Sequence, residues 1–335
     1  MGRKNGIIFT VMLLIGSAIF YWSMRTVNMV KLLHDLAHAN WWWFIVAVIA
    51  MLIYLVMEAA IVKVFVDTQH EKLNWYNALR VPLVEQFGNG ITPFATGGQP
   101  MQMFAMAQAG VDAGRAGSIL LMKFVVFQGM IVINFLIALV ISFHYIEAKV
   151  HALSLLLILG FLVHLAVITL LLLVMYWPKL TESMVKLVLW PLKRFRKTSY
   201  TKWSVILADK ISNFHDESQR MGHNGLAIGK AIVLTFIQLF FYYLIPYFVL
   251  LGLGVQHINV VLVTAFNVLI FMIISLFPIP GGTGGAEASF QVVFSTFLSS
   301  QATLVLAMLI WRFITYYLGM FLGIIALNMS VKKDT

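Results

Sequence analysis

Two stretches of this sequence combine backbone-breaking residues with polar side chains in otherwise apolar surroundings. In the stronger one, 275–290, two prolines and four glycines come before a single carboxylate, Glu287. Proline removes a backbone donor and stops a helix, and glycine permits backbone conformations that other residues avoid. Non-helical backbone at bilayer depth is tolerated only where protein buries it or where it lines a wet cavity. An acid at such a break is therefore a candidate for binding a ligand.

A weaker stretch of the same kind lies in the first third of the chain, at 88–100. Two prolines and a Gly-Gly pair interrupt apolar sequence there, and Glu85 comes just before it. Gly/Pro-interrupted segments that occur once in each half indicate a transporter binding site near the middle of the membrane. The alternative interpretation is two ordinary loops between membrane helices, because loops near helix ends often contain Gly and Pro.

Other polar side chains fall inside the apolar runs, where an ionised group costs several kcal/mol unless it is paired or wet. Arg312 is the most informative of these, together with Glu287. Lys123 is a weaker candidate, because it lies close enough to the start of its run for its ammonium group to reach the interface. We interpret the lone histidine and the amides as hydrogen-bonding partners between helices. The polar residues in the runs are Glu58, Lys123, Gln128, Asn134, His164, Gln238, Asn267 and Arg312.

The composition places the chain among membrane proteins. Hydrophobic residues make up 61% of it and charged residues 11%, against about 25% charged residues in soluble domains. There is no cysteine, which excludes disulfides and thiolate metal sites. His34 and His38 have the i,i+4 spacing of a metal site, but we interpret 25–40 as an interfacial amphipathic helix. The sequence predicts no cofactor and no metal.

Seven stretches are long and apolar enough to span a hydrocarbon core of about 30 Å as helices. They are 7–24, 42–66, 118–143, 152–176, 229–251, 258–277 and 303–328. Two further segments, 81–107 and 284–300, are interrupted or short, and each is either a re-entrant pair of half-helices or a broken span. We therefore predict an all-α, polytopic integral membrane protein with seven to nine transmembrane helices. It forms a single domain, 1–335, with a first half 1–176, a basic loop 177–228 and a second half 229–335.

Charge is concentrated in the segment that joins the halves. Residues 177–230 contain ten Lys or Arg and four Asp or Glu, which gives +6 of the net charge of +10. Basic loops stay on the cytoplasmic side, so this loop and the N-terminus, with Arg3 and Lys4, are predicted to be cytoplasmic. We expect a multi-pass protein of the cell membrane. The sequence has no GxxxxGK[ST] motif and no nucleic-acid module, so any transport is passive or driven by a gradient, and no DNA partner is expected.

The two interrupted stretches carry a family resemblance. Residues 278–287 read Pro-Ile-Pro-Gly-Gly-Thr-Gly-Gly-Ala-Glu, which resembles the Pro-x-Pro-Gly-Gly-x-Gly-x-x-Glu motif of the lysylphosphatidylglycerol synthase transmembrane-region family. That family includes the flippase half of the bacterial multiple peptide resistance factor. The run 89–93, Asn-Gly-Ile-Thr-Pro, with Gly-Gly-Gln-Pro at 97–100, is similar to the motif of the family's first half. Many members have Arg before the glutamate, whereas this chain has Ala286.

The resemblance implies a flippase-like protein that binds or moves an aminoacylated, lysyl-phosphatidylglycerol-like lipid or a glycosylated phospholipid. Outer-leaflet cationic lipid would then lower the negative surface potential and the binding of cationic antimicrobial peptides. Glu85 and Glu287 would face a cationic headgroup, and Arg312 or Lys123 a phosphate. The predicted substrate-binding residues are Glu85, Asn89, Thr92, Pro93, Gly97, Gly98, Gln99, Pro278, Pro280, Gly281, Gly282, Gly284, Glu287 and Arg312.

Two other functions remain open at this point. The family name implies a phosphatidylglycerol lysyltransferase, which takes the aminoacyl group from lysyl-tRNA. We expect this chain, which ends at Thr335, to lack the soluble catalytic domain of such a synthase. The other alternative is a membrane partner of a separately encoded synthase or glycosyltransferase.

The predicted topology can be tested with cysteines, since the chain has none of its own. A cysteine at Ser199, in the basic loop, should be protected from an impermeant thiol reagent in intact cells, whereas one at Ala148 should be labelled. Labelling of position 199 from outside would reject the prediction.

Overall fold

The computed structural model describes residues 29–68, 72–149, 151–177, 179, 183, 215–216, 218–220, 222–298 and 300–332, and every regular element in these ranges is a helix. Five helices in this part of the chain are long and apolar enough to cross a membrane. They are α3 (Trp41–Asp67), α6 (Ala113–Lys149), α7 (His151–Tyr176), α10 (Gly225–Gly252) and the continuous run of α13 (Gln301–Arg312), η3 (Phe313–Tyr317) and α14 (Leu318–Leu327). The prediction of an all-α membrane protein is thereby confirmed, while the predicted span 7–24 lies outside the described residues.

The two interrupted stretches both form helical hairpins. Hairpin 1 consists of α4 (Trp75–Ile91), η1 (Pro93–Ala95) and α5 (Gly98–Gln108), and hairpin 2 of α11 (Val260–Ile274), η2 (Pro280–Gly282) and α12 (Gly285–Phe294). The stretch 258–277 was predicted to be a full span, and the structure corrects this. Its helix α11 has 15 residues, which rise about 22 Å and fall short of the roughly 30 Å core, and the chain then turns back at η2.

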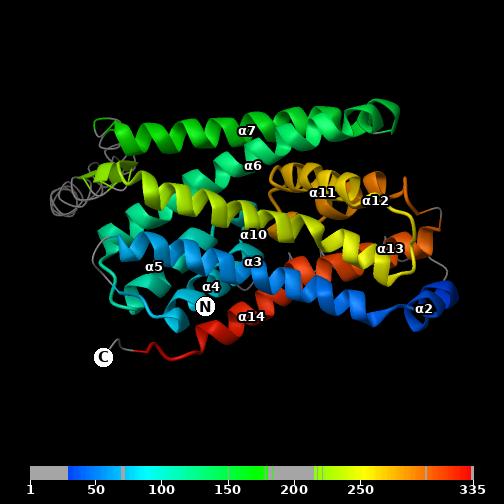
Figure 1. Cartoon of the computed structure of the whole chain (residues 1–335), viewed down its shortest axis with the longest axis horizontal. Coiled ribbons are helices and arrows are strands. Elements are labelled where there is room, and N and C mark those ends of the chain that lie inside the picture. The colour runs from blue at the N-terminus through cyan, green and yellow to red at the C-terminus, as the bar shows by residue number, and fades with distance from the viewer. Residues whose placement is uncertain are drawn as a thin grey trace, which may run out of the picture.

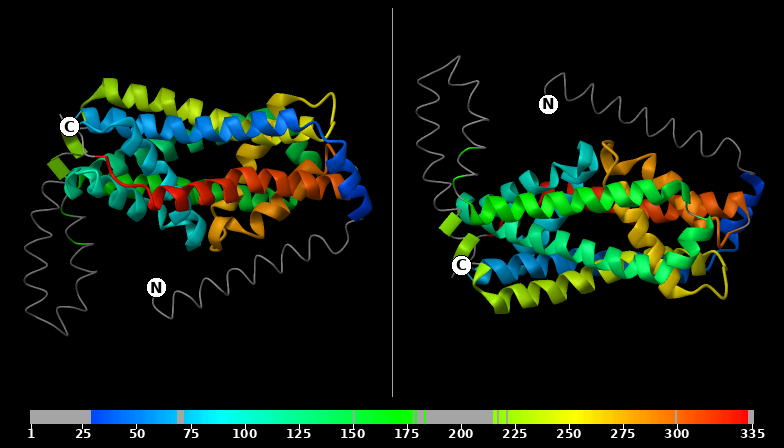
Figure 2. Two further views of the ribbon diagram at one scale, coloured as in Figure 1. Left: turned by 90° about the horizontal axis from the view of Figure 1, so that it is seen from below. Right: turned by 90° about the horizontal axis from the view of Figure 1, so that it is seen from above.

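The hairpins enter the molecule from opposite ends and meet at their tips. Helices α3, α7 and α14 all end at one end of the molecule, which we call the loop end, and hairpin 1 enters from there (Figure 1). Hairpin 2 enters from the other end. The turns η1 and η2 are in contact, and both views in Figure 2 show the two tips side by side near mid-length.

This arrangement is an inverted repeat. Each half contains a long helix, a hairpin and a second long helix, and the leading helices α3 and α10 run antiparallel along most of their length (Figure 1). The first arm of each hairpin packs on a long helix of the other half: α4 lies against α14, and α11 against α6. In transporter folds, inverted repeats place the binding site at the repeat interface near the bilayer midplane.

Short polar signals determine where the helices begin. The side chains of Asn40, Asn74, Asn224 and Asn259 each accept a hydrogen bond from a backbone N–H in the first turn of α3, α4, α10 and α11. Asparagine is among the preferred residues at this position because its oxygen satisfies an otherwise unpaired donor. The apolar runs then continue as helices, since their backbone groups have to pair within the segment in hydrocarbon.

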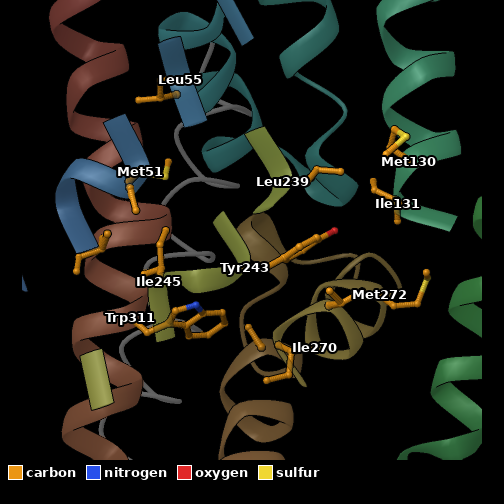
Figure 3. Close-up of a cluster of buried hydrophobic side chains, with 14 of the residues drawn as sticks. Met51, Leu55, Met130, Ile131, Leu239, Tyr243, Ile245, Ile270, Met272 and Trp311 are labelled. Carbon is orange, nitrogen blue, oxygen red and sulfur yellow. The ribbon is translucent and has the colours of Figure 1, made fainter. Parts of the chain in front are cut away.

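One large apolar core includes residues of the long helices and of both hairpins. Figure 3 shows Met51 of α3 beside Ile245 of α10. On the side of hairpin 2 the core is aromatic, with the ring of Trp311 stacked on Phe290 at 4.9 Å. Stacked rings of this kind add stability beyond the area they bury. The residue that follows Trp311, Arg312, is therefore held in a well-packed wall.

The predicted interfacial helix forms α2 (Met29–Ala37), at the end opposite the loop end. Leu32 on its inner face is buried against Leu306 of α13. Thr303 Oγ1 donates a hydrogen bond of 2.6 Å to Asp35. The rings of His34 and His38 stack on each other at 4.1 Å, so this pair contributes to the surface of α2.

Hairpin 1 closes at a contact that requires glycine. A Cβ added to Gly97 would lie 2.6 Å from the carbonyl oxygen of Gly88, in the opposite arm. Because the obstacle is backbone, the clash cannot be relieved by rotating a side chain. The two arms can therefore approach this closely only without side chains at the crossing.

We expect Gly97→Ala to lower the free energy of unfolding by about 1–3 kcal/mol, the usual range for overpacking. The matched control is Gly129→Ala in α6, where an added Cβ would meet no atom within 4 Å. That control should be neutral or slightly stabilising, because alanine favours a helix by up to about 1 kcal/mol over glycine. Thermal unfolding in detergent measures both, and equal midpoints for the two variants would contradict the account.

Candidate functional site

The two hairpin tips repeat one short sequence and one backbone conformation. Residues 93–98 read Pro-Phe-Ala-Thr-Gly-Gly, and 280–285 read Pro-Gly-Gly-Thr-Gly-Gly. In each tip the threonine hydroxyl donates to the carbonyl of the proline, at 3.0 Å in hairpin 1 and 2.8 Å in hairpin 2. The two residues after each proline have left-handed backbone, with φ of 52° and 53° in hairpin 1 and 65° and 61° in hairpin 2.

The two tips thus share the pattern Pro-x-x-Thr-Gly-Gly, a closer likeness than the Gly and Pro content alone indicates. Left-handed backbone is unfavourable for residues with a side chain, by roughly 1–2 kcal/mol each. Hairpin 2 has glycine at both such positions, whereas hairpin 1 has Phe94 and Ala95. Hairpin 1 is therefore the more strained of the two tips, and strain of this kind clusters at functional sites.

Glu287 binds two different partners at the start of α12. Its Oε2 accepts the backbone N–H of Gly284 at 2.5 Å, as in a capping box. Its Oε1 accepts from Arg312 Nε at 2.7 Å. The carboxylate therefore caps a helix and neutralises a cation. We call Glu287 and Arg312 the tip ion pair.

One helix, α13–η3, holds both tips. A terminal N–H of Arg312 donates to the carbonyl of Gly281 in hairpin 2 at 2.9 Å. Four residues later, Tyr316 OH donates to the carbonyl of Gly90 in hairpin 1 at 2.8 Å. The guanidinium carbon lies 5.0 Å from the centre of the Tyr316 ring, within the range of a cation–π contact. The helix takes a π turn between these side chains, and such turns often mark functional sites.

A second group of charged side chains lies deeper, between α3, hairpin 1, α6 and α10. We call it the buried charge cluster: Glu58, Glu85, Gln102, Lys123 and Gln238. The ammonium of Lys123 contacts Glu58 Oε1 and lies 3.1 Å from Glu85 Oε2. Gln102 accepts from the same ammonium at 3.0 Å, and Gln238 donates to Glu58 Oε2 at 3.3 Å. The exposed fractions of the three charged side chains are 3% for Glu58, 5% for Lys123 and 13% for Glu85.

This cluster corrects our interpretation of Lys123. We expected its ammonium to reach the interface, because the residue lies near the start of an apolar run. From Ala113 to Lys123, however, α6 rises about 15 Å, and the side chain points inward to two carboxylates. A lysine side chain can reach the interface only along a free path on the helix surface. The Lys123 ammonium instead stays inside, because it pairs with carboxylates of α3 and α4. Sequence periodicity could not reveal this, since the partners come from α3 and α4.

Arg80 is a further cation held inside the protein. It lies in α4 with 3% of its surface exposed. Its Nε donates to the carbonyl of Ala326 near the end of α14 at 3.0 Å, and a terminal N–H donates to Gln108 at 2.5 Å. A cation is favourable at a helix C-terminus because the last carbonyls are unpaired.

The structure separates the predicted site residues into two groups. Glu85 and Asn89 lie in α4, 3.4 Å apart between Asn89 Nδ2 and Glu85 Oε1, and face the buried charge cluster. Glu287 and Arg312 form the tip ion pair instead, so the two predicted acids do not share one position. The predicted tip residues of hairpin 1 are Thr92, Pro93, Gly97, Gly98 and Gln99, and those of hairpin 2 are Pro278, Pro280, Gly281, Gly282 and Gly284. Predicted hydrogen-bonding partners are also found, with His164 joining Gln128 at 2.8 Å and Ser275 at 3.1 Å.

The cluster predicts unequal effects for two substitutions. Lys123→Met leaves two buried carboxylates without a cation and should lower the free energy of unfolding by about 3–5 kcal/mol. Glu58→Gln leaves Glu85 paired with Lys123 and keeps the side-chain volume, so the loss should be about 1 kcal/mol, the size of a hydrogen bond. Thermal unfolding of the purified variants separates the two, and equal losses would show that the three charges do not act as one network.

Comparison with known proteins agrees with this architecture. Residues 9–323 match the model of the lysylphosphatidylglycerol synthase TM region. The chain is also similar to a UPF0104 membrane protein of Archaeoglobus fulgidus, with 25% identity over 308 residues that cover 88% of this chain and 89% of that protein. The match to the family model covers most of the chain, both hairpins, the tip ion pair and the buried charge cluster. The chain therefore belongs to the lysylphosphatidylglycerol synthase transmembrane-region family.

Proposed function

We propose that this membrane protein translocates a phospholipid with a cationic or glycosylated headgroup between leaflets. The observation that carries the proposal is the meeting of two re-entrant hairpins, which enter from opposite ends and touch at mid-length. Discontinuous helices at a repeat interface are the usual way in which transporters build a polar site at bilayer depth. Membership of the family supports a lipid substrate, since the family is named after a lipid synthase.

The charges near the tips suit a zwitterionic or cationic headgroup better than a neutral one. The tip ion pair places a carboxylate and a guanidinium side by side, with side-chain exposures of 14% and 7%. A headgroup that carries both an ammonium and a phosphate can exchange partners with such a pair, because each of its charges replaces one member. Arginine is well suited to phosphate through its planar set of donors. We therefore assign headgroup recognition to Glu287 and Arg312.

A cavity in the lipid-facing wall suits an acyl chain. It has a volume of about 380 Å³ and lies between α6, α10 and α11, with mainly apolar walls that include Ile137, Phe236, Phe240 and Val261. These four side chains are between 44% and 51% exposed, so the cavity is open to surrounding lipid. An acyl chain in this groove would remain in apolar surroundings while the headgroup moves past the hairpin tips.

A reconstituted assay tests the proposal directly. Liposomes with and without the purified chain contain tail-labelled lysyl-phosphatidylglycerol or tail-labelled phosphatidylglycerol, and a quencher added outside reports the outer leaflet. We expect the protein to accelerate exchange of the lysyl lipid more than that of phosphatidylglycerol. Exchange at the protein-free rate for both lipids would refute translocation, and labelled lysyl lipid formed from lysyl-tRNA would favour a transferase instead.

Glu287→Gln separates the two roles of this carboxylate in the same assay. Glutamine retains an acceptor for the Gly284 N–H but leaves Arg312 without its counter-ion, so a purely capping role predicts normal exchange. We expect exchange of the lysyl lipid to fall about tenfold or more, corresponding to at least 1.4 kcal/mol, while the protein still accumulates in the membrane. The matched control is Asp67→Asn, which neutralises a carboxylate that is 47% exposed and paired with Lys63, and it should leave exchange unchanged. Full exchange by Glu287→Gln would remove Glu287 from the site.

A further inference from the structure

In the buried charge cluster, the negative charges outnumber the positive charges by one. Glu58 and Glu85 share the single ammonium of Lys123, so the fully ionised cluster carries a net charge of −1. An uncompensated charge in a buried position costs several kcal/mol. The remaining members of the cluster, Gln102 and Gln238, are neutral amides. The cluster therefore requires one further positive charge.

Among the residues that the structure describes, the charged groups on neighbouring helices do not supply it. Arg80 is bound to Ala326 and Gln108, and Arg312 to Glu287 and Gly281. His164, on the outer side of α6, is bound to Gln128 and Ser275. The nearby phenols are those of Tyr54, Tyr242 and Tyr243, with ring centres 5.3 Å apart between Tyr54 and Tyr242 and 6.0 Å apart between Tyr242 and Tyr243.

The hydrogen bonds in the cluster indicate what kind of ligand is missing. An ammonium has three donors, and those of Lys123 are directed to Glu58, Glu85 and Gln102. The amide nitrogen of Gln238 donates to Glu58, but its Oε1 is buried and has no hydrogen-bond partner among the described residues. Gln238 is 1% exposed, so bulk water does not reach this acceptor. One further donor inside the cluster would satisfy it.

The burial of the cluster restricts the size of that ligand. Glu58 is 3% exposed, and Glu85, the most accessible of the charged members, is 13% exposed. A lipid headgroup cannot reach Glu58 without separation of the helices that enclose it. A proton can reach it, because it passes from one hydrogen-bonded group to the next. Glu85 would be the point of entry, since it also contacts Asn89 on the way to the tip of hairpin 1.

We propose that Glu58 and Glu85 together bind one exchangeable proton, and that this cluster couples lipid movement to a proton gradient. With the proton bound, the cluster is neutral and contains the additional donor. Without it, the net charge of −1 lies against hairpin 1, whose tip is the more strained of the two. Loss of the proton thus favours displacement of hairpin 1 toward water. The proton site stands independently of the lipid, whereas its coupling rests on the proposed function.

Infrared difference spectroscopy of the purified protein tests the proton site without any lipid transport. The carbonyl band of a protonated, buried carboxyl should be present near neutral pH, disappear on alkaline titration and correspond to one carboxyl per chain. Glu58→Gln and Glu85→Gln should each remove the titrating band, and Asp67→Asn should retain it. Glu58→Gln leaves a balanced Glu85–Lys123 pair, so this variant should fold. The test can therefore be decided on Glu58→Gln even if Glu85→Gln is unstable. An unchanged band in Glu58→Gln, or a band displaced by sodium at constant pH, would overturn the proposal.

Coupling is tested in the liposome assay with a pH difference across the membrane. One pH unit is a tenfold ratio of proton activity, so coupling of one proton per lipid predicts about tenfold asymmetry of the lysyl lipid between leaflets at steady state. Glu58→Gln should exchange the lipid without asymmetry. If the wild-type protein exchanges the lipid but the pH gradient produces no asymmetry between leaflets, coupling is refuted and the proposed function remains intact. If no lipid exchange is seen at all, the proposed function fails, and the infrared titration still decides whether the cluster binds a proton.

Discussion

The constraint on which this structure depends is that backbone groups freed inside hydrocarbon must find partners within the protein. The two breaks at mid-length free such groups. In each break, side chains from the break itself or from one neighbouring helix bind backbone groups. The threonines cap the proline carbonyls, Glu287 caps the start of α12, and Arg312 and Tyr316 bind Gly281 and Gly90. A helix without the π turn of η3 would present Arg312 and Tyr316 at a different angle. The local geometry of one helix therefore determines whether both hairpins can end where they do.

The two groups of charges differ in how completely they are satisfied. In the tip ion pair, both oxygens of Glu287 have donors, and the charges of acid and base cancel. In the buried charge cluster, two acids share one base, and an amide oxygen has no donor. Because the tip ion pair is neutral and fully hydrogen-bonded, a ligand has to replace both of its partners to bind there. The buried charge cluster has an excess charge and an unpaired acceptor among the described residues, so a single small cation can bind to it. The tip therefore suits selection of a substrate, and the deeper cluster suits response to an ion.

Much of this arrangement was predictable from sequence, and the failures have a common cause. The rarity of charge in apolar runs singled out Glu287 and Arg312, which the structure pairs with each other, and Gly/Pro clusters located both breaks. The sequence could not show which charges would be inside, because burial of a charge depends on partners from other helices: Lys123 is retained by α3 and α4, and Arg80 by the end of α14. The prediction of a full span at 258–277 was wrong because an apolar run of that length and composition can also be one arm of a hairpin. The duplicated Pro-x-x-Thr-Gly-Gly pattern was the readable signal that would have identified both segments as equivalent.

Helix α7 lies at the edge of the molecule (Figure 1), and of its most apolar stretch only 17% is buried. Its importance lies in the direction that it gives to the chain that follows it. Between the start of α3 and the start of α10, three of the described helices run along the length of the molecule: α3, α6 and α7. Because each reverses the direction of the chain, α10 runs opposite to α3 and the second repeat is inverted relative to the first. Removal of α7 alone would leave each repeat intact but give both the same orientation, so that both hairpins would enter from one side. A helix with little share in the core thus sets the relative orientation of the two hairpins.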